Sequence, residues 1–170
     1  VIVSGGIDIT NAWITNPAPY ANGNGWTLSA DATFDAGNQC AEYWNKGGAT
    51  IKQTLTNLPK GAYKLTAIAL TRTGRVATLS AGEASMNIVT IDNGTVNSRG
   101  QANTWFNAGN GINDLNFTLD AAAASLEIGL TADNTTSDYW MVWRSFSLTY
   151  YGDPINLAKA ALAEAVANAE

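Results

Sequence analysis

The sequence predicts an all-β fold in which two antiparallel sheets pack face to face. Between residues 7 and 152, short β segments alternate with turns that are rich in Gly and Asn, and no helix pattern interrupts them. Roughly eight to ten such segments are present, a number that suits a sandwich of two sheets. The length of 170 residues is enough for one domain with a substantial core.

The clearest strand covers residues 124–131. Leu126, Ile128 and Leu130 share one of its faces and polar residues share the other, which is the alternation of a half-buried strand. Residues 115–119 alternate in the same way just before it. We therefore expect these two segments to be neighbouring antiparallel strands.

Residues 51–58 and 62–72 form a second pair of expected strands, joined by a turn that contains Pro59. The later half of the second segment is apolar on both faces, because Ile68 and Leu70 alternate with small apolar residues. A strand of this kind is covered by other structure on both sides. We therefore expect residues 62–72 to be a central strand.

Further strands are predicted at 26–29, 40–44, 76–80, 86–91 and 142–150. In the last of these, Val142 and Phe146 are expected to point into the sandwich, and Trp143 to lie on the opposite, more polar face. Arg144 would interrupt the inward face. We therefore place it near the open end of the strand, where its charge can reach water.

Residues 16–25 and 92–113 are expected to be long loops, because Pro, Gly and Asn are frequent there. The chain changes character at Asp153, a residue type that caps helices, which is followed by Pro and an Ala-rich stretch. We divide the chain into a β-sandwich domain at 1–152 and, at 153–170, the start of a helical linker or of a following helical domain. The protein is expected to be larger than this chain.

Composition argues against several classes of function. Charged residues make up 14% of the chain, the formal net charge is -5, and Lys and Arg are scattered, so nucleic acid is not expected as a partner. The absence of histidine removes the commonest general base and transition-metal ligand.

Cys40 is the only cysteine and is expected to be an inert buried thiol. No apolar run is long enough to cross a membrane, and we expect the sequence to begin after a signal peptide that has been removed.

Three segments resemble one family of domains. They are AEYWN at 41–45, QTLTNLPKGAYKL at 53–65 and DYWMVWRSFSLTYYG at 138–152. Together they are similar to galactose-binding-like β-sandwich domains, which resemble carbohydrate-binding modules and occur in secreted, multidomain glycan-processing proteins of Gram-negative bacteria. The resemblance extends over residues 13–152, and it departs from the family pattern at Arg144-Ser145, where the family usually has Asp-Asn.

This resemblance implies a jelly-roll sandwich in which residues 53–65 form a hairpin of one sheet. It also implies an extracellular or bacterial cell-surface location, a role in glycan utilisation and a catalytic or adhesive partner domain. The matching residues are mostly of the kind that build a fold. The resemblance alone therefore does not imply that this chain binds a sugar.

Sugar binding needs a flat aromatic face and a few polar groups that reach the hydroxyls of the ring. The chain has six Trp, each of which can instead belong to the core. Core packing is the expectation, with ligand contact as the alternative, for Trp13, Trp26, Trp44 and Trp140, and both roles stay open for Trp105. The candidate ligand-binding residues are Trp105, Arg99, Asn103, Trp44, Trp140, Asp138, Arg144 and Arg72.

A glycoside hydrolase would need two carboxylates that face each other across a cleft, one of them held protonated. The spacing of the acidic residues singles out no such pair, and the residues weighed are Glu42, Glu83, Asp114, Glu127, Asp133 and Asp138. We therefore expect no catalytic activity from this domain. No cofactor is expected either. A structural calcium ion is the alternative, for which residues 31–38 are the nearest match, although a plain polar loop explains them more simply.

The sequence thus favours a non-catalytic carbohydrate-recognition or accessory domain of a larger secreted or cell-surface protein that processes glycans. Its expected partners are an oligosaccharide or polysaccharide and the adjacent domains of the same polypeptide. The alternative is a structural spacer or protein-interaction module that positions a neighbouring domain. Trp105 together with Trp44 or Trp140 on a common exposed face would favour recognition.

Overall fold

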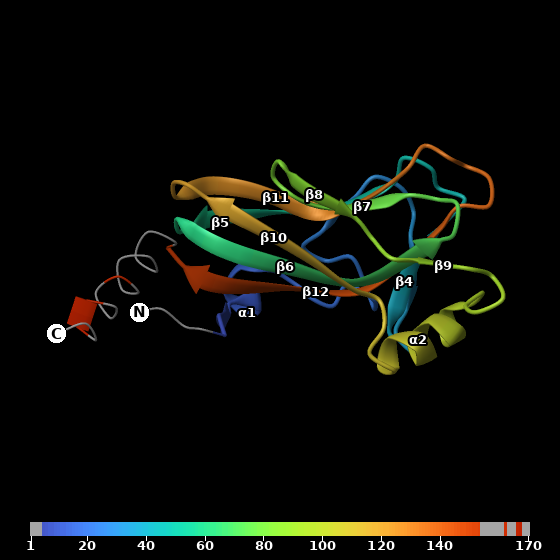
Figure 1. The fold of residues 1–170 in the computed structure, drawn as a ribbon. Helices are drawn as coiled ribbons and strands as arrows, with labels where there is room; N and C mark the ends of the chain where they lie inside the picture. The colour runs from blue at the N-terminus through green and yellow to red at the C-terminus, as the bar shows by residue number, and fades with distance from the viewer. Residues whose placement is uncertain (1–4, 154–161, 163–165, 168–170) are drawn as a thin grey trace.

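The computed structural model describes residues 5–153, 162, 166 and 167, and it shows a sandwich of two packed sheets, as the sequence predicts (Figure 1). Within the described residues, seven strands form one sheet and five form the other. None of the helices in this part of the chain is long and apolar enough to cross a membrane. The helix predicted after Asp153 falls mostly outside the described residues.

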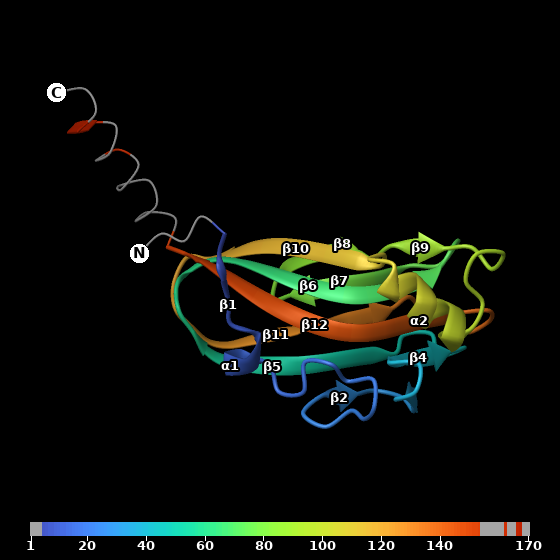
Figure 2. The ribbon, with the colours of Figure 1, turned by 90° about the horizontal axis from the view of Figure 1, so that it is seen from below.

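The seven-stranded sheet contains β1 (Ile7–Asp8), β3 (Thr33–Asp35), β4 (Cys40–Trp44), β6 (Gly61–Arg72), β9 (Thr90–Ile91), β10 (Ile112–Leu119) and β12 (Trp140–Gly152). Its order is β10-β6-β12-β4-β3, with β1 beside β12 and β9 beside β6. The five-stranded sheet contains β2 (Thr27–Leu28), β5 (Thr50–Leu58), β7 (Ala77–Ala81), β8 (Ala84–Asn87) and β11 (Ala123–Ala132), in the order β2-β5-β11-β7-β8. Helix α1 (Thr10–Trp13) follows β1, and helix α2 (Arg99–Asn107) lies over one end of the seven-stranded sheet, beside β4 (Figure 2).

The main core fills the space between the sheets. In β11, Leu126, Ile128 and Leu130 point into it, which confirms the alternation predicted from the sequence. In β6, Leu65 and its alternate neighbours face the same core, whereas Leu70 faces outward beneath α2. Because β6 lies between β10 and β12, its predicted central position is also confirmed.

A second, smaller core lies on the outer side of the seven-stranded sheet, between that sheet and α2. It includes the Cys40 thiol, Val142 and, from the helix side, Phe106. Cys40 is buried as predicted. Burial raises its pKa to about 11, which favours the unreactive thiol form. This second core fixes α2 on the sheet and so sets the shape of the surface around it.

Two predicted strand pairs are wrong. Residues 51–58 and 62–72 belong to different sheets, as do 115–119 and 124–131, because β5 and β11 are in the five-stranded sheet whereas β6 and β10 are in the other. All four strands turn an apolar face to the same core. A short turn that carries the chain across the sandwich satisfies that pattern as well as a hairpin does. The hairpin implied for residues 53–65 is therefore an arch between the sheets.

The prediction of an uninterrupted loop at 92–113 is also wrong, because this segment contains α2. Ser98 is the N-cap residue, and its hydroxyl oxygen accepts a hydrogen bond of 3.3 Å from the backbone N–H of Gln101. The Gln101 side chain in turn accepts one of 2.7 Å from the backbone N–H of Asn97. This reciprocal arrangement is close to a capping box, for which the spacing Ser-x-x-Gln is the sequence signature.

For the part of β12 before residue 145, the prediction of which side chains face the core is wrong. A shift in the pairing of β12 with β6 between Trp143 and Ser145 leaves Arg144 as an extra residue, which is a β-bulge. Trp143 is therefore fully buried in the main core, while Val142 faces α2. Phe146 points into the sandwich as predicted. Arg144 lies in the middle of the strand and not at its open end.

Candidate functional site

A cleft of about 520 Å³ opens on the outer side of the seven-stranded sheet, where the sheet meets the first turn of α2. Four of the predicted ligand-binding residues line it, namely Trp44, Arg72, Arg99 and Trp140. Trp44 and Trp140 are directly paired across β4 and β12. Side chains on opposed positions of neighbouring strands share one face of a sheet, so residues far apart in the sequence meet here.

The Arg72 guanidinium lies close to both indole rings. Its central carbon is 5.0 Å from the centroid of the Trp44 ring and 5.5 Å from that of Trp140, which are cation–π distances. Arg72 is only 6% exposed. It donates hydrogen bonds to Asp138 at 2.7 Å and to Asn97 at 3.2 Å, while its buried Nε has no partner among the described residues.

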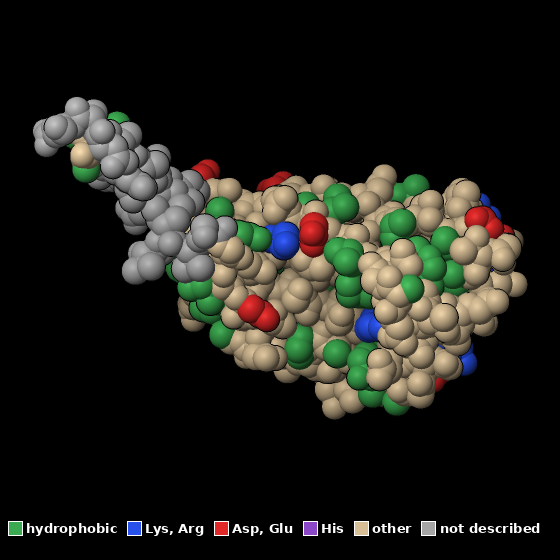
Figure 3. All heavy atoms as spheres, turned by 60° about the horizontal axis from the view of Figure 1, so that its bottom comes forward, with side chains coloured by type: hydrophobic (Ala, Val, Ile, Leu, Met, Phe, Trp, Pro, Cys, Tyr) green, Lys and Arg blue, Asp and Glu red, His purple; other side chains and the backbone are tan. Residues whose placement is uncertain are grey.

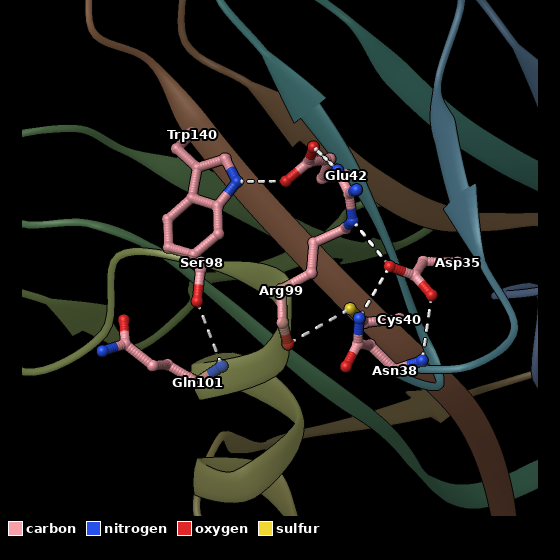
Figure 4. Close-up of polar contacts among 8 residues, drawn as sticks. All are labelled: Asp35, Asn38, Cys40, Glu42, Ser98, Arg99, Gln101 and Trp140. Carbon is pink, nitrogen blue, oxygen red and sulfur yellow. Dashed lines mark hydrogen bonds and ion pairs between the residues drawn. The ribbon is translucent and has the colours of Figure 1, made fainter.

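A chain of polar contacts links Trp140 through Glu42 and Arg99 to Asp35 (Figure 4). Trp140 Nε1 donates to one oxygen of Glu42 at 2.6 Å, and the other oxygen of Glu42 accepts from Arg99. Arg99 also donates from Nε to Asp35 at 2.9 Å. Since Arg99 is the first residue of α2 and Glu42 is in β4, these contacts hold the helix to the sheet and fix the orientation of the Trp140 ring.

The carboxylate of Asp35 is strongly stabilised in its ionised form. The side-chain amide of Asn38 donates to it at 2.8 Å and the backbone N–H of the same residue at 2.9 Å. These bonds, together with Arg99, lower the pKa of Asp35 to about 2. Because this value lies below the unfolded value of 3.8, the carboxylate stabilises the fold above about pH 4, and the effect is lost as the pH falls toward 2.

We expect Asp35→Asn to lower the free energy of unfolding at neutral pH and to have almost no effect on it near pH 2. The measurement is urea denaturation of wild type and variant at several pH values between these limits. Asp120→Asn, at an exposed turn position, is the control. A difference between wild type and Asp35→Asn that does not change with pH would contradict the assignment.

The Trp residues divide between core and surface differently from the expectation. Trp26 and Trp140 are buried as expected, and Trp13 is half-buried against the core. Trp44, which was expected in the core, is 46% exposed. The reason is that Tyr43 points into the core, so its neighbour must lie on the outer face of β4.

The remaining candidates lie around the cleft and along α2. Asp138 pairs with Arg72 at the edge of the cleft. Arg144 donates to Asn103 and to Asn107, and its guanidinium lies 5.1 Å from the centroid of the Phe106 ring, so it ties α2 to the bulge of β12. That Asn103 and Arg144 contact a ligand stays a prediction. Trp105 is half-buried and lies on a separate groove of α2.

Sequence reasoning missed the polar groups that α2 and the preceding loop bring to the cleft. Asn97, Ser98 and Gly100 line it beside Asn38. The capping-box spacing would have revealed the helix start, and thereby the turn that presents them. Without the helix they are residues of a polar loop like many others.

The acidic residues weighed for catalysis are held by different partners. Glu127 pairs with Lys52 and Asp114 with Lys64, while Asp133 accepts a bond of 2.7 Å from the backbone N–H of Val76. The part of the chain that the structure describes holds no group of three or more His, Cys, Asp or Glu side chains able to bind a metal ion. Calcium binding at residues 31–38 and the absence of catalytic activity both stay predictions.

The described face of the seven-stranded sheet is mostly neutral, with few charged side chains (Figure 3). No family model and no curated protein matches the sequence. Solved structures do match. TmCBM61 in complex with β-1,4-galactotriose aligns over 81% of this chain and 97% of that chain, with a TM-score of 0.54 at 12% identity. This chain has the fold of a carbohydrate-binding module. The resemblance in the sequence is thereby confirmed for the fold.

Two further structures with carbohydrate-binding modules align less closely. The CBM22-1 and GH10 modules of the Clostridium thermocellum endo-1,4-β-D-xylanase 10B, complexed with xylohexaose, align with a TM-score of 0.42 at 12% identity, over 82% of this chain and 28% of that chain. A variant of CBM29-2 aligns with a TM-score of 0.41 at 11% identity, over 86% and 92% of the two chains.

Proposed function

We propose that this module binds neutral glycans in the cleft between β4, β12 and the first turn of α2, and that it is a non-catalytic recognition domain. The observation that carries the proposal is the exposed ring of Trp44, which is held in place by Arg72 beside the buried Trp140. An exposed indole fixed against a buried support offers a flat apolar face at little cost in conformational entropy. The apolar face of a pyranose ring fits such a surface.

The polar groups of the cleft suit the hydroxyl groups of a sugar. Asn38, Asn97 and Ser98 line it with side chains that both donate and accept hydrogen bonds. Glu42 and Arg99 are already held by each other, so they are oriented before a ligand arrives. A site that is ordered in advance loses less entropy on binding.

The charge in and around the cleft favours a neutral sugar over an acidic one. Arg72 and Arg99 are the cations, and Asp138, Glu42 and Asp35 are paired with them. Two positive groups thus face three negative ones. A uronic acid would bring a further negative charge to a site that has no positive charge to spare.

We also propose that the module serves a larger secreted or cell-surface protein that processes glycans. The module fold and the sparsely charged, Asn-rich surface support this context. Binding at a shallow polar cleft is expected to be weak for each site, and tethering to an adjacent domain would raise the effective concentration at a polysaccharide. A spacer that positions its neighbour is the alternative, and it requires no sugar affinity.

The test is calorimetric titration with β-1,4-galactotriose, xylohexaose and a panel of other neutral oligosaccharides. We expect at least one of them to bind, and Trp44→Ala to weaken that binding by about tenfold or more, because the stacking face is lost. Val76→Ala, which shortens another exposed apolar residue outside the cleft, should leave binding unchanged. The spacer would be favoured if no neutral glycan bound, or if Trp44→Ala had no effect.

A further inference from the structure

A second groove, of about 360 Å³, runs along α2 on the other side of its first turn. Trp105 forms one wall, and Val96 and the exposed residue Ala108 contribute to the others. The Trp105 ring packs against the core beneath α2, with its centroid 5.8 Å from that of Phe106. It is therefore a supported, half-exposed aromatic surface like that of Trp44.

The helix geometry explains why this groove exists. Gln101, Thr104, Trp105 and Ala108 are spaced at i, i+3, i+4 and i+7, so they share one face of α2. The loop at residues 95–96 lies along that face and forms the opposite wall. The lining residues of the groove come from α2, from Ala108 just after it and from the loop before it, and the loop is tied to the sheet where Asn97 accepts a hydrogen bond from Arg72.

The groove adjoins the cleft at Gly100, which lines both of them. Ser98 and Arg99 line the cleft just before this glycine, and Gln101 lines the groove just after it. A Cβ at this position would lie 3.5 Å from the side-chain oxygen of Asn38, so a larger residue would project toward the cleft. The nine residues of α2 span roughly 13 Å at about 1.5 Å per residue, so the two sites lie within the reach of one short oligosaccharide.

We propose that the Trp105 groove is a second sugar subsite, which receives the units of a glycan chain that continue from the cleft past Gly100. This inference rests on the proposed function of the cleft. It assigns the module to internal segments of a neutral glycan chain and not to a single terminal sugar. Trp105 is then the stacking platform of the second subsite.

The polar groups beside Trp105 are suited to sugar hydroxyls. The oxygen of the Gln101 side chain accepts from the backbone of Asn97, and its amide nitrogen donates to no described residue, so both of its protons are free for a ligand. The hydroxyl of Thr104 donates to the backbone oxygen of Gly100 at 3.1 Å, which leaves its oxygen free to accept. An apolar ring face flanked by a donor and an acceptor is a composition suited to a pyranose.

The experiment follows each Trp separately in protein labelled with 5-fluorotryptophan. The chain has six Trp, and the fluorine signals of Trp44 and Trp105 are assigned from the variants Trp44→Phe and Trp105→Phe. The probes are two series of oligosaccharides, β-1,4-linked galactose and β-1,4-linked xylose, each from the monosaccharide to the hexasaccharide. We expect short members of the binding series to shift the Trp44 signal alone, and long members to shift both.

Affinity provides a second readout. We expect Trp105→Ala to weaken binding of the hexasaccharide by about tenfold and to leave that of the shortest binding sugar unchanged. Trp105→Phe keeps an aromatic face and should retain most of the affinity. Because Trp105→Ala also removes contacts beneath α2, Ala108→Arg is the second variant, in which an exposed residue is extended across the groove. It should produce the same selective loss with an unchanged melting temperature.

The outcomes separate this inference from the proposed function. If long sugars shift Trp44 but not Trp105, and both groove variants bind them normally, the second subsite is refuted and the cleft stands. If no member of these two series, and no oligosaccharide of the neutral panel used for the cleft, shifts either signal, the subsite and the cleft are refuted together. If an apolar peptide shifts Trp105 and no sugar does, the groove binds a protein segment and the subsite is again refuted.

Discussion

Asn113→Asp should destabilise the fold by about 3 kcal/mol or more at neutral pH. Asn113 is 2% exposed, and its side-chain nitrogen donates to the backbone oxygens of Ala67, Ala69 and Gly111 at 2.9 to 3.1 Å. Its oxygen accepts from the backbone N–H of Val89 at 2.8 Å. The substitution changes almost no volume, but it places a carboxylate oxygen against three carbonyl oxygens in a buried site.

The destabilisation caused by Asn113→Asp should depend on pH. Burial and the three carbonyl oxygens disfavour the charged form, so the introduced carboxyl has a pKa in the folded state above its unfolded value of about 4. The variant is therefore least impaired below about pH 4, and its stability falls further as the pH rises through the folded pKa. Urea denaturation across this range measures the effect.

Asn116→Asp is the matched control, because Asn116 is an exposed residue of the same strand. We expect it to change stability by less than about 0.5 kcal/mol. Equal effects of the two substitutions would mean that the bonds of Asn113 do not hold the end of β10 against β6 and the segment before β9. The segment before β9 carries the chain toward α2, so the position of α2 at the cleft depends on the hydrogen bonds of Asn113.

The alternation of apolar and polar residues was enough to predict most strands and their inward faces. Leu126, Ile128 and Leu130 show why: their neighbours are polar or small, and only one arrangement buries all three. The same reasoning placed β6 in the centre of a sheet, since Ile68 and Leu70 required a second covering layer. In the structure α2 supplies that layer.

Alternation did not predict the faces of β12, because a bulge exchanges the inward and outward positions of the strand and nothing in the sequence marks the bulge. Before the bulge Met141 and Trp143 point inward, and after it Phe146 and Leu148 do so. Arg144 occupies the extra position, where its side chain can turn to the carbonyl and amide oxygens of α2 and the loop before β4. In a long apolar and aromatic run, either set of alternate residues can face the core, so the pattern alone could not locate the shift.

Pairing partners could not be predicted either, because an apolar face specifies the core it points to and not the strand beside it. Leu58 and Tyr63 are both buried on either side of the same turn, although they belong to different sheets. The hydroxyl of Tyr63 donates to the backbone oxygen of Pro59, and this bond fixes the arch.

The sequence analysis named candidate residues but did not predict the cleft in which some of them meet. Composition suggested aromatic residues and arginines as candidates, and four of the eight candidates line one cleft with a fifth, Asp138, at its edge. Their grouping depends on the pairing of β4 with β12 and on α2, neither of which the sequence alone revealed. Trp44 was expected inside because aromatic rings dominate the cores of β-sandwiches.

The second large effect concerns Arg72 and Asp138, which should respond to substitution in opposite ways. We expect Arg72→Met to weaken glycan binding by about tenfold or more, because Trp44 loses the guanidinium that fixes its ring. Its cost in stability should be small, about 1 kcal/mol. Two features keep this cost small. The side chain of Asp138 is 54% exposed, so water can solvate the carboxylate that remains. The substitution also removes a buried cation whose Nε has no hydrogen-bond partner among the described residues.

Asp138→Asn leaves the Arg72 cation buried and without its counter-charge, so we expect it to lower the free energy of unfolding by about 1.5 to 2 kcal/mol, more than Arg72→Met does. The backbone of Asp138 has φ of +52°, a conformation that Asn adopts readily, so the substitution changes charge without adding strain. Because the Trp44 and Trp140 rings still hold the guanidinium, sugar affinity should fall only a few-fold. Urea denaturation of both variants ranks their stabilities, and calorimetric titration ranks their affinities for the sugar. If Arg72→Met proved the less stable of the two, or Asp138→Asn the weaker binder, Arg72 would be a structural ion pair and not the support of a binding surface.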